Sequence, residues 1–457
     1  MSDLPRVLLA DATWYGTLAA LRNLGLHGVP VTLASDSLMA PARWSRHVTQ
    51  VHSCPSTKNA DRFLDWLLRF GANNPGHVLY PTSDETAWLA SANSDVLSDY
   101  FQLYAPPARS LLRLLDKACL AEEARAAGLD VPECRFPRDE AEAATLANEI
   151  GFPIYVKPRA QLFGTGLGKG ECTRNLSELR LAWCAQRDRC SYKTAVLKEV
   201  PDLSLPMLQR AVTGSERIYT VDGFVDATGE LYVSLACVKL LQRPRGSGPG
   251  IIFEHAESNW TVDAGLKRLF QNTGYFGVFD AEFLECGEQM LLVDINPRFY
   301  NHMAFEIDRG LPLPWLAYLA ATRDWDILRQ EVSRAQLCQP KCRRYVDRLS
   351  TTLLLATQRL KGAMSIEDQT RWGSYLNDCD ASTAEPARAP NDPGPAIAEI
   401  AMEAFAFARH PRAYLKGLWR SPSYPDGNRH QSHLNGDGTV APSVMLGYAP
   451  KNQSSIL

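Results

Sequence analysis

The sequence predicts an α/β protein in which strands and helices alternate, and two observations support this class. Short apolar runs that suit buried strands are followed by segments of helical period over most of the first 325 residues. Glycine and proline mark the ends of many of these segments. At 457 residues, the chain has room for about three structural units.

Composition and charge exclude several classes of protein. Hydrophobic residues make up 45% of the chain and charged residues 22%, as in ordinary globular proteins. With 48 basic and 51 acidic side chains the net charge is −3, which argues against a nucleic-acid partner. Apolar runs such as Thr352–Ala356 are far shorter than the ~20 residues of a membrane span, and the N-terminus shows no secretory signal. We therefore expect no membrane partner.

The eleven cysteines are spread thinly along the chain. An odd number without a signal peptide indicates a reducing compartment, so we expect a cytoplasmic protein. Cys338 and Cys342 form the one close pair, and no second pair lies at the spacing of a zinc site. The cysteine spacing therefore does not predict a structural zinc ion.

The first hundred residues predict a βαβ unit and a third strand. Arg6–Ala10 is a short apolar strand, Thr17–Leu26 has helical period, and Val29–Leu33 is a second strand. The turn after the first strand lacks the G-x-G-x-x-G pattern of a dinucleotide site. His77–Pro81 is the third strand, and Thr82–Glu85 offers capping residues for the next helix.

The middle of the chain predicts two helices and then a series of strands. One helix runs across Leu111–Ala127 and ends at Gly128, and another covers Asp139–Ile150. The predicted strands are Ile154–Pro158, Arg217–Val221, Leu231–Lys239, Val278–Leu284 and Met290–Ile295. From about residue 326 the alternation weakens. Asp380–Pro395 contains four prolines and is interpreted as a linker or surface loop, and the last ~37 residues as a mobile tail.

Acidic side chains are placed for metal binding near residue 290. Alternation puts Asp280 and Glu282 on one face of a strand, and Asp294 and Asn296 on one face of the next. A hairpin through Glu285–Gln289 would bring these oxygen ligands together, as Mg²⁺ prefers. The alternative is a solvated face of an edge hairpin.

A glycine-rich segment follows Lys157, which lies near the end of a predicted strand. Backbone N–H groups of such a segment can close over a polyanion, and Lys169 adds charge. A flexible surface loop is the alternative. Lys169 is followed by glycine instead of Ser or Thr, so the segment is not a Walker A loop. Its glycines are Gly164, Gly166, Gly168 and Gly170.

Met207–Val212 is an extended apolar segment that could bind an adenine edge through its backbone, with Glu216 placed to accept ribose hydroxyl groups. Taken alone, these residues favour a plain buried strand.

Taken in order along the chain, these motifs resemble the ATP-grasp superfamily of ATP-dependent carboxylate–amine ligases. The resemblance is closest to the branch of the carbamoyl-phosphate synthase large subunit and D-aspartate ligase. It covers about residues 1–325 and depends on the E-x₁₁-D-x-N-P-R pattern with the upstream lysines in register. It implies an ATP-grasp fold whose two α+β subdomains clamp ATP. The implied divisions are a Rossmann-like pre-ATP-grasp domain (1–112), an N-terminal subdomain (113–206), a C-terminal subdomain (207–325) and a C-terminal extension, partly helical (326–457).

The resemblance also assigns roles to individual residues. Lys117, Lys157 and Lys239 match lysines that contact ATP phosphates. The segment containing Gln209, Arg210 and Val212 matches the adenine-binding hinge, and Glu216 matches the ribose-binding acid. The metal ligands are matched by Glu282, Asp294 and Asn296, and a residue near the transferred phosphate by Arg298. Asp294 departs from the usual pattern, because the second ligand is usually Glu.

Other residues are weaker candidates for binding substrate. Arg243 and Arg245 could hold a carboxylate in a bidentate manner, although a solvated loop explains them nearly as well. Tyr300 and His302 follow Arg298 and could line the acceptor pocket, although packing in the core is favoured. Thr82, Ser83 and Asp84 end a predicted strand and could face the substrate cleft; helix capping explains them as well.

The resemblance implies an enzyme that uses ATP and two Mg²⁺ ions, which Mn²⁺ can replace. It would activate a carboxylate as an acylphosphate and join it to an amine, with release of ADP and phosphate. The implied partners are a small carboxylate and an amine, together with a second copy of the chain in a homodimer. Three alternatives stay open: a carboxylase that phosphorylates bicarbonate, phosphorylation of another acceptor, and nucleotide binding without catalysis.

Overall fold

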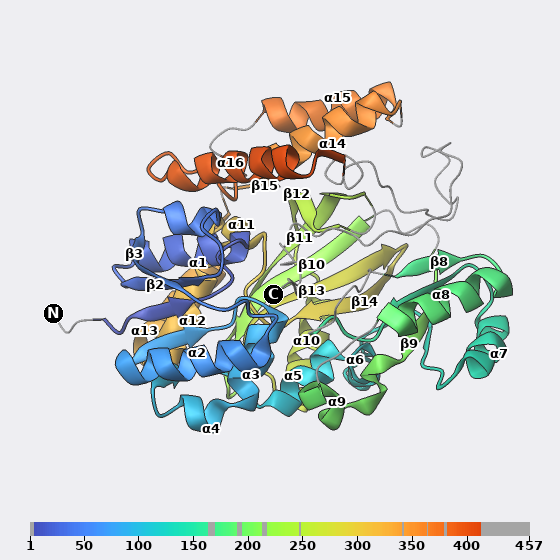
Figure 1. Ribbon diagram of the computed structural model, residues 1–457, viewed down its shortest axis with the longest axis horizontal. Coiled ribbons are helices and arrows are strands. Elements are labelled where there is room, and N and C mark those ends of the chain that lie inside the picture. Colours follow the sequence, from blue (N-terminus) through green and yellow to red (C-terminus); the bar gives the residue numbers. More distant parts are fainter. Residues whose placement is uncertain are drawn as a thin grey trace, which may run out of the picture.

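The computed structural model places three β-sheets side by side, with helices against each (Figure 1). The structure describes residues 4–162, 170–189, 194–212, 217–245, 248–340, 342–362, 364–378 and 382–412. Among these residues, no helix has the length and apolar character needed to cross a bilayer. The mixed α/β class expected from the sequence is confirmed.

The N-terminal sheet is parallel throughout and has the strand order β3-β2-β1-β4-β5. The strand order reverses between β1 and β4, which creates a crevice at the carboxyl ends of these two strands. The three strands that the sequence predicts here are all present. The elements of this domain are β1 (Val7–Leu9), α1 (Tyr15–Leu26), β2 (Val31–Ser35), η1 (Pro41–Trp44), β3 (Val48–Ser53), α2 (Ala60–Asn73), β4 (His77–Tyr80), α3 (Asp84–Ala92), α4 (Ser94–Leu97) and β5 (Phe101–Leu103).

The single helix predicted over Leu111–Ala127 is wrong: two helices meet at Asp116. α5 (Ala108–Leu115) ends there, and α6 (Lys117–Ala126) begins with the Asp116 carboxylate accepting the backbone N–H of Ala118 at 3.1 Å. The apolar periodicity continues through the break and therefore hides it. Its consequence is that Lys117 lies in the first turn of α6.

The second sheet is antiparallel, with the order β6-β9-β7-β8. Ile154 and Val156 of β7 pack against α7 and α8, while Tyr155 and Lys157 lie on the other face. The helix predicted over Asp139–Ile150 is present as α7, and Asp139 is its N-cap residue. The elements are β6 (Cys134–Arg135), α7 (Glu140–Ile150), β7 (Ile154–Pro158), β8 (Glu171–Thr173), α8 (Leu176–Arg189), α9 (Thr194–Glu199), η2 (Pro201–Ser204) and β9 (Pro206–Arg210).

The third and largest sheet has the order β14-β13-β10-β11-β12-β15-β16. One face packs its apolar side chains against α6 and α10. The hairpin predicted through Glu285–Gln289 is present and joins β13 to β14. The elements are β10 (Arg217–Val225), β11 (Tyr232–Gln242), β12 (Gly250–Ala256), α10 (Trp260–Thr273), β13 (Gly277–Cys286), β14 (Gln289–Asn296), α11 (Met303–Asp308), α12 (Leu313–Thr322) and α13 (Trp325–Leu337).

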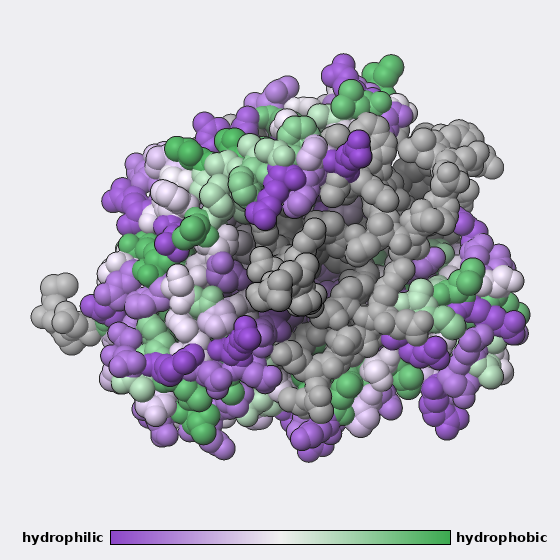
Figure 2. Space-filling model, viewed as in Figure 1, coloured by the Kyte–Doolittle hydropathy of each residue, from purple (hydrophilic) through white to green (hydrophobic). Residues whose placement is uncertain are grey.

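The chain after residue 338 extends this sheet and then covers it. β15 (Arg344–Val346) pairs with β12, and β16 (Thr383–Ala384) pairs with β15. Three helices, α14 (Arg348–Leu360), α15 (Ile366–Asn377) and α16 (Gly394–Arg409), lie along the top of the view in Figure 1. On the face shown in Figure 2, hydrophobic residues appear as separate spots among hydrophilic ones.

The segment Asp380–Pro395, expected to be a linker or surface loop, is largely irregular in its described residues from 382 onward, but part of it is buried. These residues contribute β16, and Asp392 is buried against the N-terminal domain. Its carboxylate accepts hydrogen bonds from the Arg22 guanidinium at 2.8 Å and from the Ser45 hydroxyl at 2.7 Å. Proline-rich composition suggested a solvated loop, but these charge-assisted hydrogen bonds hold the segment in place.

The contact between α16 and the N-terminal domain predicts a pH dependence of stability. Tyr15 donates a hydrogen bond to Glu399, and burial together with nearby Asp347 raises the pKa of Glu399 to about 8 from 4.5. Between these values the folded chain keeps a proton that the unfolded chain has released, so stability falls as pH rises. The slope for one such group is at most about 1.4 kcal/mol per pH unit.

Glu399→Gln removes this titration, so the loss of stability between pH 5 and pH 8 should become smaller. Urea midpoints measured at the two pH values test this result, with substitution of the exposed Glu367 to Gln as the matched control. An unchanged pH dependence in the Glu399 variant would show that this carboxyl does not hold the proton.

Candidate active site

The hairpin of β13 and β14 sets four polar side chains in two adjacent pairs. Glu282 lies opposite Asp294, and Asp280 lies opposite Asn296. The Asn296 amide donates to the Asp280 carboxylate at 2.9 Å. Because the residues alternate along both strands, these four side chains share the face opposite the apolar core of α6 and α10. The convergence predicted from the sequence is therefore present.

Lys239 reaches this acidic face from β11. Its ammonium group lies 2.5 Å from the Glu282 carboxylate and is almost fully buried. Burial alone would lower the pKa of Lys239, but Glu282 and Asp280 raise it above its ordinary value. Lys239 is therefore charged at neutral pH and lies beside a predicted metal ligand.

Lys117 approaches the same face from the first turn of α6. Its ammonium group lies 2.6 Å from the Asp294 carboxylate. Burial opposes the charge of Lys117, and the neighbouring Asp294 raises its pKa. A second lysine thus contacts a second predicted metal ligand, from an element far away in the sequence.

Arg298 joins the acidic face to the N-terminal domain. Its guanidinium donates to the Asp84 carboxylate at 2.6 Å and to the side-chain amide oxygen of Asn296 at 2.9 Å. Ser83 caps α3, and this cap places Asp84 in the first turn. The expected helix cap is confirmed, and a position of this segment facing the substrate cleft stays a prediction. Burial and the neighbouring Asp84 raise the pKa of Glu85 to about 7.

The predicted adenine-binding residues point in two directions. The Gln209 side chain lies 3.2 Å from the Lys157 ammonium group, on the face of the second sheet away from α7 and α8. Arg210 and Val212 instead line a pocket of about 730 Å³ with Leu291. Four further candidates, Gly164, Gly166, Gly168 and Glu216, lie outside the described residues.

The weaker substrate candidates lie in different surroundings. Arg243 and Arg245 face carboxylates of the C-terminal helices, Glu403 at 3.4 Å and Asp368 at 3.6 Å. Tyr300 and His302 are 3% and 5% exposed, as expected for the core packing that the sequence favours. Binding of substrate by these four residues stays a prediction.

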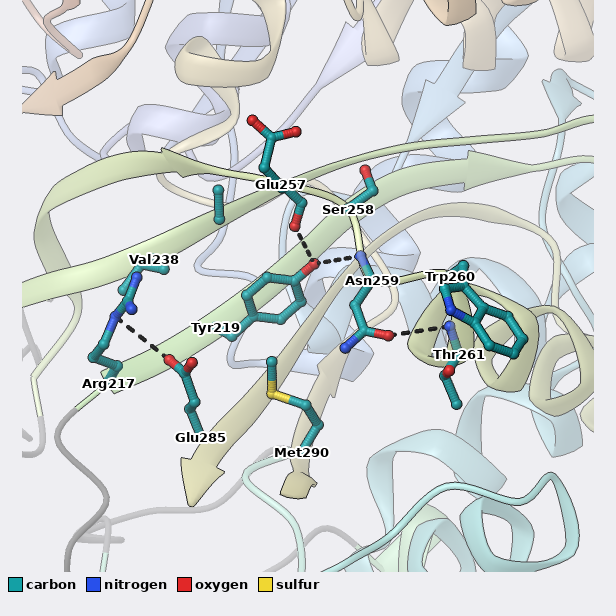
Figure 3. Close-up of a pocket in the computed structure, with 11 residues that line it drawn as sticks. Arg217, Tyr219, Val238, Glu257, Ser258, Asn259, Trp260, Thr261, Glu285 and Met290 are labelled. Carbon is teal, nitrogen blue, oxygen red and sulfur yellow. Dashed lines mark hydrogen bonds and ion pairs between the residues drawn. The ribbon is translucent and has the colours of Figure 1, made fainter. Parts of the chain in front are cut away.

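A second pocket, of about 510 Å³, lies on the side of the large sheet opposite the acidic face (Figure 3). Tyr219 projects into it, and the Tyr219 hydroxyl is held by backbone groups of Glu257 and Asn259. Arg217 and Glu285 form an ion pair at its edge. None of the predicted phosphate or metal residues lines this pocket.

The donors of the acidic face suit magnesium. Glu282 and Asp294 offer carboxylate oxygens and Asn296 offers an amide oxygen, all at one edge of the sheet. Lys117, Lys239 and Arg298 supply positive charge around them. Such a combination of hard oxygen ligands and cations can hold a metal-bound polyphosphate.

Curated proteins match the part of the chain that builds this site. The sequence is 24% identical over 331 residues to the carbamoyl phosphate synthase large chain of Thermotoga neapolitana, a match that covers 68% of this chain. The match spans only 28% of that relative's length. Over 65 residues, or 14% of this chain and 6% of the relative, the identity to the carbamoyl phosphate synthase large chain of Archaeoglobus fulgidus is 42%. No protein-family model matches the chain.

Solved structures share its architecture. The biotin carboxylase domain of Hydrogenobacter thermophilus 2-oxoglutarate carboxylase aligns with a TM-score of 0.57 at 13% identity, over 70% of each chain. Staphylococcus aureus N5-carboxyaminoimidazole synthetase aligns with a TM-score of 0.52 at 14% identity, over 70% of this chain and 78% of its own. These relatives are all ATP-grasp proteins.

Over about two thirds of its length the chain is homologous to the carbamoyl phosphate synthase large chain, and it shares the fold of ATP-grasp proteins. The resemblance and the fold predicted from the sequence are thereby confirmed. The roles assigned to single residues stay predictions. Two partners of predicted site residues were not predicted from the sequence: Asp84 as the partner of Arg298, and Asp280 as the partner of Asn296. Asp280 alternates with Glu282, and this pattern could have predicted that it lies on the same face. Asp84 and Arg298 are 214 positions apart, and no local pattern predicts their contact.

Proposed function

We propose that this protein is an ATP- and Mg²⁺-dependent ligase that joins a carboxylate to an amine. The observation that carries the proposal is the cluster of Glu282, Asp294 and Asn296 with a lysine beside each carboxylate. The substrate carboxylate attacks the γ-phosphate to give an acylphosphate and ADP. The amine then attacks the acyl carbon and releases phosphate, which leaves an amide.

The chain's own groups bind and orient the reactants. Lys117 and Lys157 hold the ATP phosphates, and Lys239 lies on the sheet side of the same polyanion. Arg298 orients the substrate carboxylate, for which a planar guanidinium suits two parallel hydrogen bonds. Mg²⁺, when bound by Glu282, Asp294 and Asn296, neutralises charge that develops on the transferred phosphoryl group. Positioning and electrostatics supply most of the rate in such a transfer.

The N-terminal crevice supports an amine as the second substrate. Asp84, at the start of α3, faces Arg298 across this crevice. Asp11 follows β1 at a φ of 51°, an unusual conformation for a residue other than glycine, and its carboxylate accepts hydrogen bonds from Thr57 and Thr82. Glu85 adds a third carboxyl group nearby. Carboxyl groups beside the acylphosphate position suit a cationic amino group.

A release screen tests the function. The full chain is incubated with Mg-ATP and pairs of carboxylic acids and amino acids, and ADP release is followed by mass spectrometry of the product. The expected result is ADP release that needs both substrates and an amide product. ADP release that depends on bicarbonate alone would identify the carboxylase alternative, and a stable phosphorylated product would identify another acceptor. Binding of ATP without turnover across the panel would overturn catalysis.

A further inference from the structure

Four potential metal ligands lie close together in the protein interior, against the large sheet and next to the acidic face. Asp222 stands on β10 and Cys237 on β11, and His302 and Glu306 come from the segment after Arg298. All four are buried, and their ligand atoms lie within 4.8 Å of one another. The cluster is separate from the predicted magnesium ligands, although Asp222 lies opposite Asp280 in the strand register.

Two of the separations between these atoms match those around a tetrahedral ion, and all the ligand atoms lie within 4.8 Å of one another. Cys237 Sγ lies 3.4 Å from one oxygen of Asp222, and His302 Nε2 lies 3.3 Å from the other. Zinc bonds of about 2.0–2.3 Å place neighbouring ligand atoms roughly 3.3–3.8 Å apart. The side chains are therefore already spaced for one shared ion.

Two oxygens in the cluster accept no hydrogen bond from any of the described residues. They are Asp222 Oδ1 and Glu306 Oε1, both on side chains with 0% exposure; Arg309 Nη1 lies 3.6 Å from Glu306 Oε1. His302 Nε2 forms a hydrogen bond with Asp222 Oδ2 at 3.4 Å and lies 3.3 Å from Asp222 Oδ1 without the geometry of a hydrogen bond. Unpartnered carboxylate oxygens are costly inside a protein, so their convergence beside a thiol and an imidazole points to a cation.

Charge and outer contacts suit a divalent ion. The carboxylates of Asp222 and Glu306 and a Cys237 thiolate carry three negative charges. A divalent ion and buried Arg309, whose guanidinium lies 3.6 Å from Glu306, would balance them. The Tyr300 hydroxyl donates to the other Glu306 oxygen at 3.2 Å, as the neighbours of a metal ligand commonly do.

We propose that Asp222, Cys237, His302 and Glu306 bind a structural zinc ion. Mixed sulfur, nitrogen and oxygen donors select zinc over Mg²⁺, which prefers oxygen alone. Four protein ligands leave no open position, so the ion has a structural role. It joins β10 and β11 to the segment that continues from Arg298, and so supports the candidate active site without taking part in the reaction.

Metal analysis of the full chain tests this site. Untagged protein purified in metal-free buffer should hold about one zinc per chain by mass spectrometry of the metal. Exchange with Co²⁺ should give the near-ultraviolet thiolate-to-cobalt band together with the visible bands of a tetrahedral ion. Cys237→Ser should remove both the zinc and the thiolate band. The matched control Cys342→Ser, at another buried cysteine, should keep them.

The outcomes separate zinc from the other reading of this cluster. Folded wild-type protein that takes up no zinc from excess Zn²⁺, or that shows no thiolate-to-cobalt band, would overturn the proposal and leave a network of carboxyl groups that share protons. The wild-type spectrum decides this even if the Cys237 variant fails to fold. Glu282→Gln should retain its zinc, so a failure of the proposed ligase activity does not affect the result.

Discussion

Replacing Glu282 by Gln should lower the rate of ATP-dependent turnover by about 100- to 1,000-fold. The Glu282 carboxylate lies opposite Asp294 and is the first of the three predicted metal ligands. A neutral amide keeps the shape and an oxygen acceptor for Lys239, but it removes the charge that holds the metal. The fold should therefore survive while Mg-ATP binding weakens. Calorimetry with Mg-ATP and the ADP-release assay measure the two effects.

Glu285→Gln is the matched control, because Glu285 lies on the same strand but lines the pocket on the opposite side of the sheet. Its partner is Arg217, at 3.4 Å, and no predicted ligand contacts it. The control should keep both nucleotide binding and turnover. Equal losses of Mg-ATP binding and turnover in the two variants would mean that general damage to the hairpin is the cause. Unchanged turnover in the Glu282 variant would show that Glu282 is not a metal ligand.

The acidic hairpin could be predicted because its signal is local. Local alternation fixes which side chains share a face at Asp280–Glu282 and at Asp294–Asn296, although the strand pairing shifts register just after Glu282. The ion pairs made by the lysines could not be predicted in the same way. Lys117 meets Asp294 across 177 positions, and this contact depends on how a helix packs against a distant sheet.

The buried cluster of Asp222, Cys237, His302 and Glu306 is a second contact between distant residues that the sequence does not predict. Cys237 and His302 lie on separate elements, and no spacing rule for metal ligands connects them. Cys338 and Cys342 are close in sequence, but their spacing does not predict a zinc site. In the structure Cys342 is buried and donates to a nearby backbone carbonyl group, whereas Cys338 is exposed. Proximity along the chain was therefore a poor guide to proximity in space.

The helix break at Asp116 was missed because periodicity reports burial rather than hydrogen bonding. The apolar residues of α5 and α6 continue one helical pattern, although the backbone turns between the two helices. What fixes the turn is the Asp116 carboxylate, which caps α6 and also accepts two hydrogen bonds from Arg159 at 3.0 and 2.6 Å. A capping aspartate inside an apolar period is a signal that sequence analysis can use.

Asp116→Ala should accordingly destabilise the protein by about 3–5 kcal/mol. Asp116 is 0% exposed and Arg159 is 7% exposed, so the substitution leaves a buried guanidinium without its main partner. Urea denaturation measures the loss. Asp139→Ala is the matched control, because exposed Asp139 caps α7 but contacts no buried cation. That change should cost only about 0.5–2 kcal/mol.

A double variant separates the lost ion pair from the lost cap. Adding Arg159→Met to the Asp116→Ala background removes the stranded charge and keeps a side chain that packs, so part of the stability should return. Full additivity of the two single substitutions would show that the pair is not coupled, and the large cost would then belong to the cap alone. The Lys117 backbone N–H donates to the Arg159 carbonyl oxygen at 3.0 Å, and this contact remains possible in the double variant because neither substitution removes a backbone group.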